Sequence, residues 1–168
     1  GALLAGTTCA QATRFWVGGN GDWNDPGHWS TAQGGPAGAG IPDRDDAVTI
    51  ASASGELVVW MSGEAEVGRL MVEGSHGAVT LEGAQGRLRI AGDLSLQGSV
   101  NWRYTGTIEL TARDGIAELD LRGMPLAGDM RFSGGGTWSM KSASGFAGDR
   151  ALELRSGTLV TNGVMLHA

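Results

Sequence analysis

Hydrophobic residues alternate with polar residues in short segments along most of this chain, and most of these segments end at a glycine. The segments with this pattern are RLMVEG (69–74), AVTLEG (78–83), RLRIAG (87–92), DLSLQG (93–98), TIELTA (107–112), AELDLRG (117–123), DMRFSG (129–134), LELRSG (152–157) and TLVTNG (158–163). Apolar residues two positions apart point to the same face of a β-strand. No stretch shows the three- and four-residue spacing of an amphipathic helix. The pattern therefore predicts an all-β protein.

The connections between these segments favour a β-solenoid over a β-sandwich. A sandwich needs hairpins with short Asn-Gly or Asp-Gly loops, and such pairs are few: Asn20-Gly21, Asp114-Gly115 and Asn162-Gly163. The spacers vary widely in length, which a solenoid tolerates because insertions leave the coil as loops. We expect a right-handed parallel β-helix over residues 47–168, with three short strands and about twenty residues or more in each of about five coils. A β-sandwich is the alternative.

Composition narrows the class of protein. The 168 residues, 41% of them hydrophobic, are enough for one domain with a buried core. The 30 glycines follow no triplet period, and we expect them in turns. The net charge is -6 and the 12 basic residues are scattered singly, so we expect no nucleic-acid partner. No run of about 18 apolar residues predicts a transmembrane helix.

The first twelve residues, GALLAGTTCAQA, differ from the rest of the chain. A short apolar run is followed by Ala10-Gln11-Ala12, the small-x-small pattern that signal peptidases cleave. We therefore expect residues 1–12 to be a signal-peptide remnant. The mature protein would be secreted, and either extracellular, on the cell surface or associated with the outer membrane. Cys9 is the only cysteine and lies in this segment, so the mature chain would have no thiol chemistry.

A tryptophan- and glycine-rich stretch, FWVGGNGDWNDPGHWS (15–30), has two competing interpretations. One is an N-terminal cap and loop over residues 13–46: the end of a solenoid exposes its core and unpaired strand edges, and indole rings can cover them. Glycines, Gly21 among them, would let the backbone approach those rings, and Asp25 before Pro26 favours a short helical start. The predicted cap residues are Trp16, Gly18, Gly19, Trp23, Asp25, His28 and Trp29. The other interpretation is an exposed platform for stacking glycans, made of Trp16, Trp23 and Trp29.

The same stretch carries a resemblance. RFWVGGNGDWNDPGHWSTAQGG and the following GAGIPDRDDAVTI resemble the N-terminal start of large secreted bacterial adhesin-like surface proteins, common in Bacteroidetes and relatives. In that family, a W-x-G-G-x-G-x-W-x-D-x-x-H-W-S box, a glycine-rich loop and a Pro-x-x-x-Asp-x-Val segment lead into a β-helix. GRLRIAGDLSLQG, TGTIELTA, GGGTWSM and LELRSGTLVTNGVMLHA are similar to its repeat coils. The resemblance runs from about Arg14 to the end, and it implies the N-terminal part of a longer surface protein.

Candidate catalytic chemistry is sparse. The histidines, His28, His76 and His167, lie far apart, and neither a zinc spacing nor a G-x-S-x-G motif is present. Aspartates could offer oxygen ligands to calcium, the one cofactor considered: Asp22, Asp25, Asp43, Asp45 and Asp46. The glutamates fall mostly at outward strand positions or in loops and indicate a solvated face: Glu56, Glu64, Glu66, Glu73, Glu82 and Glu109. We assign no catalytic, cofactor-binding or metal residue.

The leading hypothesis is a secreted or cell-surface structural or adhesion protein, in which a non-catalytic β-helix forms a stalk. Its expected partner is an extracellular polysaccharide or a host or cell surface. The alternative is a carbohydrate-active β-helix, lyase- or hydrolase-like, with carboxylates converging near Trp60, Trp102 or Trp138. A third hypothesis is a glycan-binding module that uses the N-terminal tryptophans, and it requires those rings to be exposed.

Overall fold

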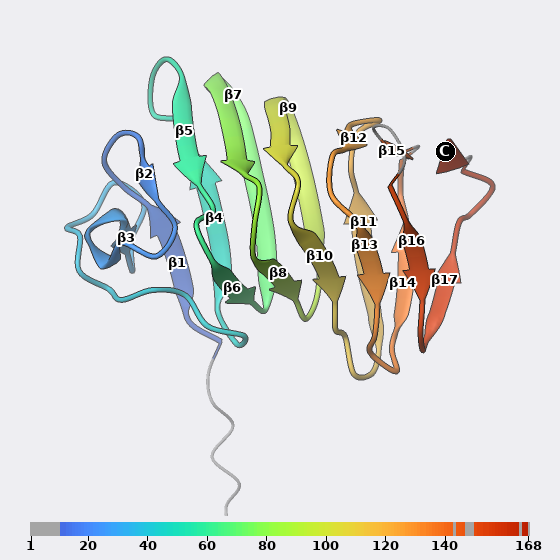
Figure 1. The fold of residues 1–168 in the computed structure, drawn as a ribbon. Helices are drawn as coiled ribbons and strands as arrows, with labels where there is room; N and C mark the ends of the chain where they lie inside the picture. The colour runs from blue at the N-terminus through green and yellow to red at the C-terminus, as the bar shows by residue number, and fades with distance from the viewer. Residues whose placement is uncertain (1–10, 143, 147–149, 165, 168) are drawn as a thin grey trace, which may run out of the picture.

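The computed structural model describes residues 11–142, 144–146, 150–164 and 166–167. Short strands stack side by side along one axis, and the chain winds from the N-terminal end of the stack to the C-terminal end (Figure 1). All pairs between successive turns are parallel, which confirms the predicted all-β solenoid, with about five turns, and makes the sandwich alternative wrong. The predicted signal-peptide remnant lies almost entirely outside the described residues.

Each turn of the solenoid contributes strands to three faces. The first turn contains β4 (Ala47–Ala51), β5 (Leu57–Trp60) and β6 (Glu64–Val67). The next two turns contain β7 (Arg69–Gly83) with β8 (Arg87–Ile90), and β9 (Leu94–Tyr104) with β10 (Thr107–Leu110). The fourth turn contains β11 (Ile116–Asp120), β12 (Pro125–Leu126) and β13 (Met130–Phe132). The fifth contains β14 (Thr137–Met140), β15 (Ser144–Phe146) and β16 (Leu152–Leu154), followed by β17 (Thr158–Val160) and β18 (Leu166–His167).

The core consists of columns of apolar side chains, one from each turn. One column joins positions that pair in register from strand to strand: Val48, Leu70, Leu94, Leu119 and Met140. All five side chains are buried, with at most 3% of their surface exposed. The residues between them on each strand face outward, as the alternation predicts. Burying such side chains contributes about 1.5–3 kcal/mol each, so the stacking of turns is the main source of stability.

Many of the glycines lie where two turns approach closely, and this differs from the expectation that they form turns. A Cβ at Gly74 would overlap the backbone of Ser99 in the next turn, and a Cβ at Gly77 would overlap the carbonyl of Gly55 in the turn before. Gly134 is related to Ala112 in the same way. These positions need glycine because the backbones of adjacent turns leave no room for a side chain.

Two predicted strand boundaries are wrong because glycines that were expected to end a strand lie within one. The segments at 69–74 and 78–83 form one long strand, β7, which is irregular between Gly74 and Val79 but does not end there. The glycine that closes the predicted strand at 93–98 lies within β9. The alternation pattern also did not single out β5, β6 or β12.

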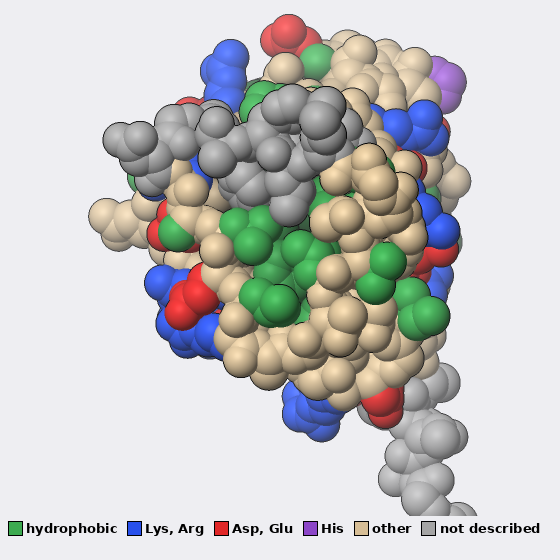
Figure 2. All heavy atoms as spheres, turned by 90° about the vertical axis from the view of Figure 1, so that its right-hand side faces the viewer, with side chains coloured by type: hydrophobic (Ala, Val, Ile, Leu, Met, Phe, Trp, Pro, Cys, Tyr) green, Lys and Arg blue, Asp and Glu red, His purple; other side chains and the backbone are tan. Residues whose placement is uncertain are grey.

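The C-terminal end of the described coils presents apolar side chains at its centre (Figure 2). Leu152 and Leu154 continue the columns of Met130 and Phe132, but Leu154 is 49% exposed whereas Phe132 is 1% exposed. Val160, on the neighbouring strand β17, is also exposed. The two ends of the described solenoid therefore differ, because the N-terminal end is covered by the segment described next.

Candidate functional site at the N-terminal end of the solenoid

The segment before the first turn lies across its strand edges. β1 (Thr13–Trp16) pairs in parallel with β4, and β2 (Gly21–Asp22) pairs in parallel with β5. β3 (Trp29–Ser30) then pairs antiparallel with the outer edge of β1. The strands of the cap thus use backbone groups on two faces of the first turn that would otherwise offer an edge to another chain.

The three tryptophans of this segment form one buried cluster. Trp23 and Trp29 are fully buried and Trp16 is 6% exposed. Trp29 meets the other two rings edge to face, with centroids 5.0 Å from Trp16 and 4.9 Å from Trp23. The indole Nε1 of Trp29 donates to the Trp23 carbonyl at 2.8 Å, whereas Nε1 of Trp23 is buried with no partner among the described residues. Buried rings suit the cap interpretation, and the three rings do not form the exposed face that a glycan platform needs.

His28 holds the outer side of this cluster. Its imidazole stacks on Trp16, and its Nδ1 lies 3.0 Å from the carbonyl oxygen of Val17. A Cβ at Gly21 would overlap this imidazole, and a Cβ at Gly18 would lie 3.3 Å from it. The glycines of the box therefore make room for the histidine, whereas the sequence suggested that they make room for the indoles.

The short helical start predicted at Asp25-Pro26 is present. Pro26 begins the 3-10 helix η1 (Pro26–His28), and the Asp25 carboxylate accepts a hydrogen bond from the Gly27 N–H at 2.8 Å. Proline is suited to this position because its missing N–H would have no partner in a helix start. The turn of η1 directs His28 back toward Val17.

Arg14 and Asp46 form a largely buried ion pair at the cap. Arg14 lies on the same inward face of β1 as Trp16, and it pairs in register with Val48. Its side chain therefore lies at the N-terminal end of a core column. Its Nε lies 3.4 Å from the Asp46 carboxylate, which is also a hydrogen-bond acceptor for the Asp43 N–H at 3.1 Å. Asp46 compensates the positive charge of Arg14, which would be costly to bury alone, although the Arg14 Nε has no hydrogen-bond partner among the described residues.

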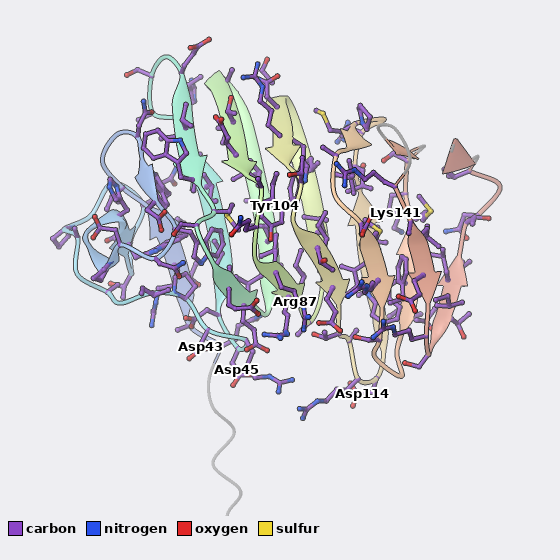
Figure 3. All side chains as sticks on the ribbon, in the orientation of Figure 1. Asp43, Asp45, Arg87, Tyr104, Asp114 and Lys141 are labelled. Atoms are coloured by element: carbon purple, nitrogen blue, oxygen red, sulfur yellow. The ribbon has the colours of Figure 1, made fainter. Side chains whose placement is uncertain are left out.

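The aspartates considered for calcium are used in turns. Asp43 and Asp45 lie on the turn before β4, at the lower edge of the solenoid (Figure 3). The Asp43 carboxylate accepts the Asp45 N–H at 2.9 Å, and the Asp22 carboxylate accepts the Asn24 N–H at 2.8 Å. Within the described residues, no group of three or more His, Cys, Asp or Glu side chains is placed to hold a metal ion.

The other tryptophans have different environments. Trp102 and Trp138 face inward and are 5% and 0% exposed, so neither can take part in a surface groove. Trp60 faces outward and is 44% exposed. Asp22 and Glu82 pair in register with it on the adjacent strands. Carboxylates thus flank Trp60 alone among the three positions considered for a carbohydrate-active site.

A surface groove of about 530 Å³ lies between the cap and the loop that joins β4 to β5. Its walls include Gly18 and Gly19 of the cap and residues 51–54. Phe15, on the outward face of β1, contributes an aromatic side chain. The polar residues that line the groove include Gln33, Glu56, Glu73, Ser75 and His76. The sequence did not single out this set as a site, because the coil register alone brings its members together.

A ladder of alternating charge runs along the face formed by β6, β8, β10, β13 and β16. Its members pair in register from turn to turn: Glu66, Arg89, Glu109, Arg131 and Glu153. Glu109 lies at its centre, 3.3 Å from the Nε of Arg89 and 3.5 Å from an Arg87 nitrogen, and it accepts the Ser133 hydroxyl at 2.9 Å. The glutamates were expected to form a solvated face, but Glu64 and Glu109 form ion pairs with arginines of this face.

Tyr104 lies inside the solenoid at the end of β9 (Figure 3). Its hydroxyl is buried and has no hydrogen-bond partner among the described residues. Burial, with a smaller effect of Glu64, raises the pKa of Tyr104 to about 12. Tyr104 is not among the residues that line the groove.

Comparison with models of known protein families, with curated proteins and with solved structures finds no match to this chain. Among the described residues, no helix is long and apolar enough to cross a membrane.

Proposed function

We propose that this protein is a secreted or cell-surface structural or adhesion protein in which the β-solenoid serves as a non-catalytic stalk. The observation that carries the proposal is the continuous core, which runs through all the turns and is covered at its N-terminal end by the tryptophan cluster. A solenoid of this kind extends in one dimension, because each turn contacts only its neighbours. Such a body separates its two ends and presents long, regular faces.

The outward faces support a role in contact rather than in catalysis. Several of their charged side chains are paired with each other, as in the ladder around Glu109 and the contact of Lys141 with Glu118 at 2.8 Å. Charges held in such pairs are less available for acid–base chemistry. Several weak contacts along one face would add up through avidity.

Surface location can be tested on intact cells of the source organism. We expect an antibody against the solenoid to label intact cells, and externally added protease to remove the label. Labelling only after lysis would contradict a surface or secreted role.

The carbohydrate-active alternative is tested separately with purified protein. Incubation with neutral and acidic polysaccharides should release neither new reducing ends nor unsaturated uronate products. Release of either product, lost when Glu82 is changed to Gln, would show an enzyme that uses the face around Trp60 and would contradict the non-catalytic proposal.

A further inference from the structure

One wall of the groove between the cap and the first two turns contains a glycine that the fold itself does not require. Gly19 forms part of this wall, and its backbone does not adopt the left-handed conformation that favours glycine. A Cβ at Gly19 would meet no atom within 4 Å. This contrasts with Gly21, where a Cβ would overlap His28. The cap therefore has room for a side chain at position 19, beside the groove.

The cap cluster holds this wall in place. Nε1 of the nearly buried Trp16 donates to the Gly19 carbonyl at 3.1 Å, and His28 contacts the Val17 carbonyl while stacking on Trp16. The groove wall is thus attached to buried rings and is a rigid part of the cap. Rigid walls reduce the entropy lost when a ligand binds.

The lining of the groove selects a class of ligand. Phe15 supplies a half-buried aromatic surface, while Gln33, Ser75 and His76 supply hydrogen-bond donors and acceptors. Glu56 and Glu73 add acceptors and negative charge, which disfavours an anion. The volume of about 530 Å³ lies in the range of small-ligand sites.

We propose that this groove binds a short segment of a neutral polysaccharide. A sugar ring presents hydroxyl groups that donate to the carboxylates and exchange hydrogen bonds with Gln33 and His76, and it presents C–H groups to Phe15. A cationic peptide is the competing occupant, because it too would satisfy the carboxylates, and the oligolysine probe in the test below distinguishes it from a neutral polysaccharide. The inference goes beyond the stalk function and does not depend on where the stalk is located.

The test measures binding of purified protein to a soluble β-glucan, a xylan and a mannan, with polygalacturonate and an oligolysine as charged probes. Gly19→Leu adds a bulky side chain at the groove wall, and Phe15→Ala removes the aromatic surface of the groove. Trp60→Ala is the matched control, because it removes an exposed aromatic side chain outside the groove. Thermal unfolding of each variant shows whether it is folded.

We expect at least one neutral polysaccharide to bind. Gly19→Leu and Phe15→Ala should each weaken this binding at least about tenfold, whereas Trp60→Ala should leave it within about twofold. Gly19→Leu should keep the melting temperature of the parent protein. The proposal is overturned if no neutral polysaccharide binds, if a charged probe binds in its place, or if folded Gly19→Leu and Phe15→Ala proteins bind as the parent does. Loss of binding in Trp60→Ala alone would also overturn it, by placing the site on another face.

Discussion

The imidazole of His28 lies flat on the indole of Trp16, with ring centroids 4.6 Å apart and ring planes inclined by 7°. This stack links η1 to β1 and covers the one indole of the cluster that is not fully buried. Gly21, on β2, lies so close to the imidazole that a Cβ there would overlap it. His28 thus joins three elements of the cap, and its loss should loosen all of them.

The contact between Gly21 and His28 can be measured as a coupling energy. Gly21→Ala should destabilise the protein by about 2 kcal/mol, because the new methyl group overlaps the imidazole. His28→Ala should cost about 1–2 kcal/mol through the lost stack and hydrogen bond. In the His28→Ala background the overlap is gone, so Gly21→Ala should cost clearly less than it does alone. Urea unfolding of the four proteins gives the coupling; additive costs would contradict the packing described.

The charge ladder predicts a stability effect centred on Glu109. Its carboxylate is only 14% exposed and contacts Arg87, Arg89 and Ser133. Glu109→Gln should therefore cost about 1–2 kcal/mol, more than an exposed ion pair contributes. Glu82→Gln, at an exposed position on another face, should change the free energy of unfolding by less than about 0.5 kcal/mol. Equal effects of the two substitutions in urea unfolding would show that the ladder has no special role.

Ionisation of the Tyr104 phenol should lower the free energy of unfolding at alkaline pH. Its pKa is raised from 10.0 to about 12 in the folded protein, so its stabilising contribution is complete below pH 10 and falls as the pH rises toward 12. The loss attributable to this group should be about 1 kcal/mol by pH 11. Tyr104→Phe removes the titrating group and a buried hydroxyl without a partner, so it should be at least as stable as the parent at pH 8 and lose less stability at pH 11. Parallel pH profiles of the two proteins would contradict this assignment.

The alternation of apolar and polar residues predicted the solenoid because it reports directly which side chains face the core. Leu70 and Val72, the apolar pair of the segment RLMVEG, are both buried on β7. The glycines were harder to interpret. Gly74 and Gly77 look like strand ends in the sequence, but they are needed because adjacent turns come too close for a side chain, and only the register between turns shows this.

The candidate site was predicted less completely. The tryptophan and glycine residues of the box indicated a cap, but the role of His28 as the packing partner of Gly21 depends on a tertiary contact. Glu56, Glu73 and His76 line one groove although the first lies in a loop before β5 and the others on β7. The lengths of the coils decide which residues become neighbours, and no local pattern in the sequence reveals these lengths.

The tryptophan cluster caps a one-dimensional solenoid. Hydrogen exchange of the Trp29→Ala protein tests this claim most directly, because this change removes a fully buried ring and its 2.8 Å hydrogen bond to the Trp23 carbonyl. We expect the amides of β4, β5 and the first half of β7 to lose protection, while those of β11, β13 and β14 keep it. Unchanged protection in the first turn, or an equal loss along the whole chain, would contradict the claim.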